Sequence, residues 1–441
     1  MSASPPPSNP RHGVAEAALL LQRILPDPSP HEAGKGEAAD QALEQFFRER
    51  HAGPKERARI ADLVYYALRH RRPLERVVQH LLATHTVPDT LQLASAAAVA
   101  LERETSTAAH PPEAWADWQP LWALLGHAAT LAPPPLPPPS AAEQSGLPEW
   151  LWQRFSRQWG EEQALQLATA LRISAPVDLR VNTLRATREE VVAALAAARI
   201  EACPTPHAPS GVRLAQRRPL QGLESFQHGW FEIQDEGSQL IAPLLTPRPG
   251  ETIVDLCAGG GGKSLHLATL MGNRGRIVAA DIEARRLLPI GPRSKRAGVR
   301  IIRTVALRHE RDPQLKPLES KADAVLVDAP CSGLGTLRRR PEIQWQLQST
   351  QIEAYHYRQC ALLEAGARLT RPGGRLLYAT CSLLHRENQE VVAAFLADNK
   401  NFRLQPVPMP ATRPAHAPFF VLLPHQSATD GFFAALLLRI A

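Results

Sequence analysis

The sequence has few of the residues that mark disulfide-bonded, zinc-binding or membrane proteins. Its 441 residues include five cysteines, namely Cys203, Cys257, Cys331, Cys360 and Cys381. The number is odd and no pair has Cys-x-x-Cys spacing, which argues against a disulfide framework and a zinc site. No apolar run reaches the roughly 18 residues of a membrane span, and the first residues carry no hydrophobic signal region. We therefore expect a monomeric, cytoplasmic protein in a reducing compartment, without a membrane or metal partner.

The length and charge point to several domains and an anionic partner. A chain of 441 residues is too long for one typical domain, and 44% hydrophobic residues are enough to form real cores. The net charge of +7 and the pI near 9.4 suit a polyanion such as nucleic acid, although a basic pI is weak evidence alone.

The first third of the chain has a helical pattern between proline-rich segments. Residues 1–12 are rich in proline and serine and are expected to be disordered. Residues 13–130 show apolar residues at three- and four-residue intervals, as in the stretch Arg57 to Leu82, with no clear strand. They predict an all-helical domain. Residues 131–146 contain consecutive prolines and are expected to be a linker.

The rest of the chain contains strands. Residues 147–240 predict helices followed by a small α+β unit, in which Thr187 and Glu190 form a capping box. From 241 to 441 strands alternate with helices, which is typical of a doubly wound, mostly parallel sheet. A second capping box is expected at Thr350 and Glu353. The strands are expected at 252–256, 276–280, 324–328 and 375–380, and the helices at 263–272, 350–368 and 386–398.

Two cysteines follow two of the predicted strands. Asp328 ends one strand and precedes Ala-Pro-Cys331-Ser-Gly, and Cys381 ends the strand that begins near Gly374. If these strands are parallel neighbours, about 4.8 Å apart, both thiols face one cavity at the carboxyl edge of the sheet, where ligands bind. The alternative is two inert core cysteines.

A glycine-rich turn predicts a nucleoside-containing cofactor. Cys257-Ala-Gly-Gly-Gly-Gly-Lys263 lies between a strand and a helix, so its backbone can approach a ligand and the helix start offers free N–H groups. It is not a Walker A loop. Asp281, at the end of the next strand, can accept both hydroxyls of a ribose. These features alone do not separate NAD from S-adenosylmethionine.

Several motifs together resemble those of one enzyme family. They are Cys257–Lys263, Asp328–Gly333, Arg339–Trp345, Tyr378–Ser382, Gln234–Gln239 and Asp430–Phe433. They are similar to the Sun/Fmu (RsmB-like) family of S-adenosylmethionine-dependent RNA cytosine-C5 methyltransferases. The helical start, with Asp62–Arg69, resembles the NusB-type domain of the bacterial 16S ribosomal RNA member. The resemblance implies a Rossmann-like methyltransferase domain after a small α+β subdomain and a helical NusB-like, RNA-binding domain.

The resemblance also implies residue roles. Cys381 is implied as the nucleophile, Cys331 as the residue that helps to release the product, and Asp328 as the group that holds the cytosine at the cofactor's edge. S-adenosylmethionine is implied to bind Cys257, Ala258, Gly259, Gly260, Gly261, Gly262, Lys263, Asp281 and Asp328. A thiolate that adds to C6 makes C5 nucleophilic, so two thiols and a carboxylate fit this chemistry.

A base that is methylated must leave its stack, so an aromatic or arginine platform is also expected. Arg338, Arg339, Arg340 and Trp345 directly follow the active-site loop and are the candidates for RNA contact. The alternative is a solvated basic loop.

The chain departs from the family pattern in three places. Gly259-Gly260 stands where the family usually has Ala-Pro. Pro289 and Pro292 interrupt the helix expected after Asp281. The acid expected near the adenine is not evident, and Glu310, Asp312 or no residue replaces it.

The sequence therefore predicts an RNA cytosine-C5 methyltransferase that acts on 16S ribosomal RNA. Two alternatives stay open, namely the same chemistry on transfer RNA and a non-catalytic RNA-binding protein with a decayed cofactor site.

Overall fold

The computed structural model describes residues 13–25, 36–81, 87–105, 121, 138–408 and 416–440. These residues form two compact units. The first, here called the helical unit, extends to Ile173 and includes Leu337–Leu347, and the second, here called the sheet unit, holds the remainder from Ser174 onward. The segment expected to be disordered, 1–12, lies outside the described residues, as do residues 131–137 of the expected linker.

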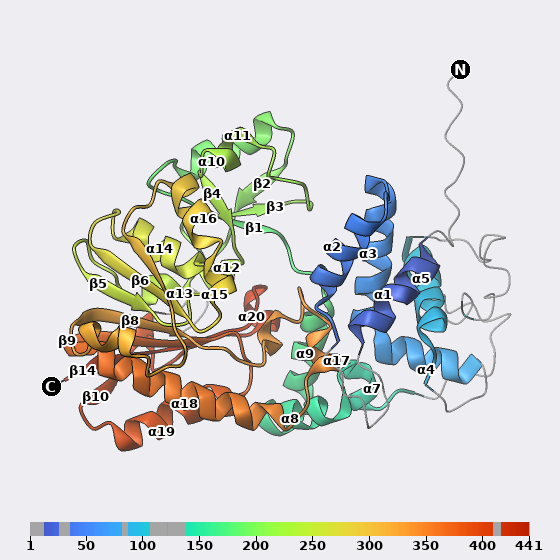
Figure 1. Cartoon of the computed structure of the whole chain (residues 1–441). Coiled ribbons are helices and arrows are strands. Elements are labelled where there is room, and N and C mark those ends of the chain that lie inside the picture. The colour runs from blue at the N-terminus through green and yellow to red at the C-terminus, as the bar shows by residue number, and fades with distance from the viewer. Residues whose placement is uncertain are drawn as a thin grey trace. The chain divides into compact units, whose positions relative to one another are not determined.

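The described residues of the helical unit contain helices and no strand, as predicted (Figure 1). Apolar residues on one side of each of the first five helices build a common core, in which Leu20, Ile60 and Leu63 are fully buried. The expected helical stretch from Arg57 is two helices, because the first ends at His70. The helices are α1 (Val14–Ile24), α2 (Ala39–Glu49), α3 (Pro54–Arg69), α4 (Arg71–Leu81), α5 (Thr90–Thr105), α7 (Ala141–Ser145), α8 (Glu149–Trp159), α9 (Glu161–Arg172) and α17 (Ile343–Gln346).

The segment Leu337–Leu347 packs within the helical unit, although the residues on both sides of it belong to the sheet unit. The Trp345 indole packs against the helical core and donates from Nε1 to the Leu68 carbonyl at 2.8 Å. The Arg71 guanidinium lies 5.0 Å from the centre of the Trp345 ring. These contacts hold α17 to the ends of α3 and α4.

The sheet unit begins with a small antiparallel sheet of strand order β2-β3-β1-β4. Helix α10 packs beside it and starts with the predicted capping box, in which Thr187 Oγ1 accepts from Glu190 N at 3.2 Å and Glu190 Oε2 accepts from Thr187 N at 2.7 Å. The elements are β1 (Asp178–Val181), α10 (Arg188–Ala197), β2 (Ala202–Pro204), β3 (Gly211–Leu214), α11 (Glu224–Gln227) and β4 (Phe231–Ile233).

The large sheet has the order β10-β14-β9-β8-β5-β6-β7, with β13 also paired to β14. The strands from β7 to β9 are mutually parallel, and β14 runs antiparallel to β9. The strands are β5 (Thr252–Asp255), β6 (Arg276–Asp281), β7 (Ile302–Ala306), β8 (Ala322–Asp328), β9 (Thr370–Thr380), β10 (Phe402–Gln405), β13 (Phe420–Leu422) and β14 (Phe432–Arg439), and a separate pair is formed by β11 (Val407–Pro408) and β12 (His416–Ala417).

Helices cover both faces of this sheet (Figure 1). Side chains alternate along a strand, so Val325 and Val327 pack with α18 and α19 on one face, while Ala324 and Leu326 pack with α13 and α14 on the other. The helical elements are α12 (Glu236–Gln239), α13 (Ile241–Leu244), α14 (Gly262–Leu270), α15 (Ala284–Leu287), α16 (Ile290–Ala297), η2 (Pro313–Leu318), η3 (Leu334–Thr336), α18 (Gln351–Leu369), η4 (His385–Glu387), α19 (Gln389–Asp398) and α20 (Pro424–Ser427). The result is the predicted doubly wound architecture.

Two expectations about helix starts have different outcomes. Pro289 does interrupt the helix after Asp281, which is split into α15 and α16, but Pro292 lies within α16 and does not interrupt it. The capping box at Thr350 is wrong, because Thr350 has helical backbone angles and its side chain makes no capping bond. Gln351 instead accepts from the Gln348 backbone N–H at 2.8 Å.

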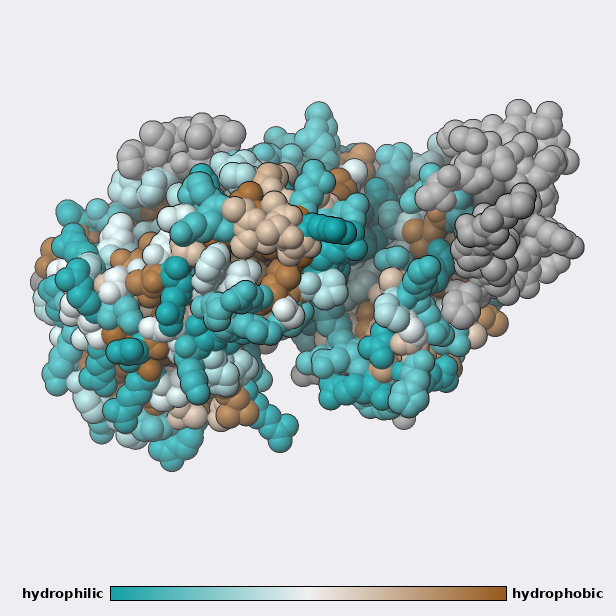
Figure 2. Space-filling model, turned by 90° about the horizontal axis from the view of Figure 1, so that it is seen from above, coloured by the Kyte–Doolittle hydropathy of each residue, from teal (hydrophilic) through white to brown (hydrophobic). Residues whose placement is uncertain are grey.

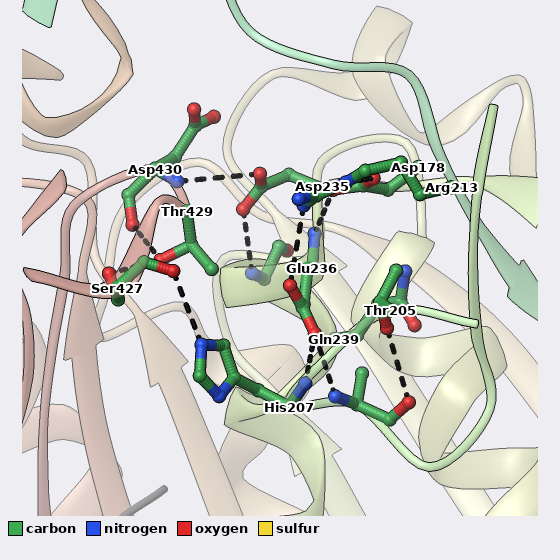
Figure 3. Close-up of polar contacts among 12 residues, drawn as sticks. Asp178, Thr205, His207, Arg213, Asp235, Glu236, Gln239, Ser427, Thr429 and Asp430 are labelled. Atoms are coloured by element: carbon green, nitrogen blue, oxygen red, sulfur yellow. Dashed lines mark hydrogen bonds and ion pairs between the residues drawn. The ribbon is translucent and has the colours of Figure 1, made fainter. Parts of the chain in front are cut away.

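A polar network joins the small sheet to the chain before β14 (Figure 3). Asp235 caps α12 and also accepts from the Asp430 backbone N–H at 3.4 Å. A β-carbon on Gly237 would lie 2.9 Å from the Phe432 ring, so the close approach requires glycine. The motifs 234–239 and 430–433, far apart in sequence, therefore pack against each other.

Hydrophilic side chains dominate the surface shown in Figure 2, with hydrophobic ones in small groups between them. Among the helices in the described ranges, none combines the length and hydropathy needed to cross a membrane.

Candidate active site

The thiols of Cys331 and Cys381 lie side by side at the carboxyl edge of the parallel strands. Asp328 of β8 pairs with Ala379 of β9, so the two strands end together. The loop after β8 and the residue after β9 then bring the Sγ atoms to 3.4 Å from each other. The predicted juxtaposition is therefore present. Because β5 and β8 are adjacent and the chain returns from β7 to β8, the switch point of the sheet lies between β5 and β8, where such folds bind ligands. The thiols, which follow β8 and β9, lie next to it.

A partly buried ion pair borders the thiols. Lys263 Nζ donates to Asp328 Oδ2 at 2.6 Å and lies 5.6 Å from the centre of the Phe432 ring. Burial lowers the pKa of the Lys263 ammonium, but Asp328 and the nearby Cys381 raise it by more, so its net shift is upward. Lys263 therefore stays charged. Lys263 was expected to contact the cofactor, and in the structure its ammonium contacts the Asp328 carboxylate beside the thiols.

The two thiols have different environments. The hydrogen bond with Cys381 is the largest cause that raises the Cys331 pKa well above its ordinary value, followed by burial. Cys331 therefore keeps its proton and can donate it in a hydrogen bond to the sulfur of Cys381. Cys381 is among the groups that raise the Lys263 pKa, so the Lys263 ammonium lies near this thiol.

The glycine-rich turn, which ends at Lys263, lies against Asp281. The Gly259 backbone N–H donates to Asp281 Oδ2 at 2.9 Å, and the Glu283 N–H donates to Asp281 Oδ1 at the same distance. Gly261 has φ +78°, and a β-carbon there would lie 2.6 Å from Ile290. The turn is thus a cradle that requires glycine, directly before the start of α14. It fits the nucleoside part of a cofactor.

Two arginines near the turn were not expected from the sequence. Arg286 lies 3.9 Å from Asp281 Oδ2, and Arg293 donates to the Gly260 carbonyl while it pairs with Glu232 at 2.9 Å. Both lie on the helices that Pro289 separates. The density of basic residues between 285 and 296 was the available signal.

The candidates for an adenine-contacting acid remain unassigned. Asp312 is buried and uses its carboxylate inside its own turn, where it accepts from the backbone N–H groups of Arg308 and Gln314 at 2.9 and 3.0 Å. These bonds lower the pKa of Asp312 well below its ordinary value. Glu310 accepts with its carbonyl from Arg368 at 3.4 Å. An adenine contact by either residue stays a prediction.

The candidate RNA platform lies in the helical unit. Arg338 is buried and donates from Nε to the Ile173 carbonyl at 3.3 Å, and Trp345 is held by Leu68. Arg340 is exposed and pairs with Glu342 at 3.3 Å, while Arg339 is half-buried. RNA binding by these four residues stays a prediction.

A doubly wound sheet with a glycine turn after its first strand and an acid at the end of its second defines a Rossmann-like domain that fits a nucleoside-containing cofactor. The family model for 16S rRNA methyltransferase RsmB/F matches residues 242–438, and its ferredoxin-like domain matches 147–221. The chain is 36% identical over 301 residues to a probable ribosomal RNA small subunit methyltransferase B of Synechocystis, with 67% of each chain covered. The corresponding enzyme of Klebsiella pneumoniae is 36% identical, with 66% of each covered. The chain belongs to the RsmB/F family of methyltransferases, and its cofactor is S-adenosylmethionine.

Solved structures extend the similarity. A methyltransferase homologue of Pyrococcus horikoshii is 30% identical, with a TM-score of 0.59. The match covers 68% of this chain and 97% of the homologue. The crystal structure of PH0851 is 26% identical, with a TM-score of 0.77 over 99% of this chain and all of that one. The match to the curated relatives spans about two thirds of their length.

Three buried polar side chains lie beside the thiols, Ser332, Ser382 and Glu387. Sequence reasoning missed Glu387 and gave no role to the two serines. A signal for two of them was present, because each of the two active-site cysteines is followed by serine.

Proposed function

We infer that this chain methylates C5 of a cytosine in 16S ribosomal RNA, through a covalent bond between Cys381 and C6 of the base. The observation that carries this inference is the thiol pair, 3.4 Å apart, next to a charged Lys263–Asp328 pair. The names of the relatives, which are ribosomal RNA methyltransferases, support the substrate class.

The first step is an attack by Cys381. As a thiolate it adds to C6, and the displaced electron pair moves through the ring and makes C5 nucleophilic. The hydrogen bond from Cys331 and the charge of Lys263 support the thiolate before the attack. Asp328 and Lys263 together offer an acceptor and a donor for the polar edge of the base. S-adenosylmethionine supplies the methyl group.

The second step is release, for which the base needs to lose the H5 proton. The Cys331 pKa is raised most by its contact with Cys381. Once the Cys381 sulfur is bonded to C6, that contact no longer holds the proton on Cys331. Cys331 can then give this proton to solvent water and, as a thiolate, accept H5. The C6–S bond breaks, and the electrons left by H5 restore the ring while sulfur leaves with its bonding pair. Attack and release are thus assigned to different thiols.

The thiol assignment is tested with substrate RNA on denaturing gels. We expect Cys331→Ala to accumulate a denaturation-resistant RNA adduct and Cys381→Ala to form none. Cys203→Ala, which removes an exposed thiol on β2, is the matched control and should behave as the unmodified protein. An adduct with Cys381→Ala and none with Cys331→Ala would reverse the roles.

The RNA is identified by bisulfite sequencing of transcripts with and without the gene. A 5-methylcytosine that disappears from 16S ribosomal RNA supports the proposal, whereas one that disappears from transfer RNA supports the first alternative. An RNA-binding protein with a decayed cofactor site is the second alternative, and the absence of S-adenosylmethionine binding in calorimetry would favour it.

A further inference from the structure

The residues that follow the two active-site cysteines meet at one carboxylate. Ser332 Oγ donates to Glu387 Oε2 at 2.6 Å, and Ser382 Oγ donates to the same oxygen. The two hydroxyl oxygens are 3.1 Å apart. Each thiol loop is thus tied to Glu387 through the side chain next to its cysteine.

Glu387 lies in η4 and has no exposed surface. Its other oxygen, Oε1, accepts from the Ser332 backbone N–H at 2.8 Å and from Gln359 Nε2 at 3.1 Å. A buried carboxylate is tolerated when donors surround it, and four donors converge on this one. Gln359 also donates to the Pro330 carbonyl at 3.1 Å, which adds a second tie to the Cys331 loop.

The backbone around Glu387 is fixed as well. Its carbonyl accepts from the Tyr378 hydroxyl of β9 at 2.6 Å, and the neighbouring Asn388 accepts from Thr380 Oγ1 at 2.6 Å. The carboxylate is therefore anchored to β9, the strand that directly precedes Cys381. From this anchor it reaches the loop that holds Cys331.

We propose that Glu387 is a positioning residue that sets the separation of the Cys331 and Cys381 sulfur atoms. Parallel strands lie about 4.8 Å apart. Beyond them the Gly335 N–H donates to the Cys381 carbonyl at 2.8 Å, but this bond lies four residues past Cys331 and does not hold the thiol itself. Hydrogen bonds from both loops to one buried carboxylate supply that constraint. The consequence for turnover rests on the proposed function, because Cys331 acts on the base that Cys381 holds. The separation itself does not rest on it.

The separation can be measured without RNA or cofactor. Phenylarsine oxide bridges two adjacent thiols with release of water and binds single thiols weakly. We expect the unmodified protein to bind it, and Cys331→Ala or Cys381→Ala to lose this binding. Glu387→Leu fills a similar volume and removes all four acceptor contacts, so its affinity should fall on the order of tenfold or more.

Glu387→Gln is the conservative rescue. Its oxygen can accept from Ser332 N and Gln359, and its amide can donate to the two hydroxyls, which rotate to accept. We expect its affinity within a few-fold of the unmodified protein. Glu390→Gln is the matched control, since Glu390 is half-exposed and pairs with Arg386 at 2.9 Å. Unchanged affinity in the folded Leu variant, or equal weakening in Gln and Leu, would overturn the proposal.

If Glu387→Leu does not fold, the double variant Ser332→Ala and Ser382→Ala removes the two hydroxyl donors and keeps the carboxylate. It should weaken arsenical binding in the same direction, and unchanged affinity would overturn the proposal. With RNA, the positioning role predicts a fall in kcat with little change in KM. Normal arsenical results without any methylation would count against the proposed function and leave the role of Glu387 standing.

Discussion

At the scale of the residue, backbone groups orient the carboxylate of Asp281, which we propose as the acceptor of the ribose hydroxyls. Two N–H groups, from Gly259 and Glu283, orient its carboxylate beside the glycine turn. We expect Asp281→Asn to weaken S-adenosylmethionine binding about tenfold or more, because a buried hydrogen bond to a charged group is removed. Isothermal calorimetry measures the change. Glu283→Gln, an exposed carboxylate two residues away, is the control, and an equal effect in both would remove Asp281 from the site.

Asp255, below the same turn, should make stability depend on pH. Burial raises its pKa from 3.8 to about 7, partly offset by a hydrogen bond from Ser264. The folded protein then binds this proton more tightly than the unfolded chain, so the contribution of Asp255 to stability is present at low pH and is lost as pH rises from about 4 to 7. The slope is roughly 1.4 kcal/mol per pH unit.

The change Asp255→Asn should remove this slope. Chemical denaturation at several pH values measures the free energy of unfolding of both proteins. As pH rises, this free energy should increase for the Asn variant relative to the unmodified protein. A difference that is constant between pH 5 and 8 would show that Asp255 titrates normally. Asp398→Asn, on α19, serves as the control.

At the scale of the element, the two expected capping boxes give a paired prediction. Thr187 has extended backbone angles and caps α10, whereas Thr350 is already helical and caps nothing. Thr187→Ala should lower the free energy of unfolding by about 1 kcal/mol, and Thr350→Ala should change it little. Urea denaturation compares the two. Equal losses would contradict the backbone difference between them.

The same pair shows what sequence can and cannot predict. Apolar strands that alternate with helices along the sequence predicted the parallel sheet. Because parallel strands end at one edge of a sheet, the positions of Cys331 and Cys381 after two such strands predicted that their thiols lie close together. The prediction of a capping box at Thr350 was wrong because a local hydrogen bond, from the Gln348 backbone N–H to the Gln351 side chain, forms at the start of α18 instead. The carboxylate of Glu387 could not be placed, because its partners come from three separate elements. Such convergence depends on tertiary structure and leaves no periodic signal.

At the scale of the whole molecule, the helical unit is discontinuous in sequence. Trp345 was expected to contact RNA because it follows the active-site loop. In the structure it packs against the apolar core that the first five helices form. The sequence could not predict the contact between Leu68 and Trp345, because the two residues are 277 positions apart. Cutting the chain between the expected domains therefore removes partners of a segment that follows the thiol loop directly.

Deletion of residues 1–140 should accordingly expose the segment 337–347. Arg338 is buried in the full chain, so trypsin should cleave after Arg338 and Arg339 faster in the truncated protein. Arg217, exposed in the sheet unit, provides an internal control whose cleavage rate should not change.

The deletion should also reduce the salt dependence of RNA binding if the helical unit binds phosphates. The log–log slope changes by about 0.7 for each phosphate of a single strand that the truncated protein no longer neutralises. Calorimetric S-adenosylmethionine affinity, measured on the same samples, separates weaker RNA binding from damage to the sheet unit. An unchanged slope together with faster cleavage would mean that the helical unit supports the loop without touching RNA. Unchanged cleavage would contradict the packing of Trp345 on the helical core.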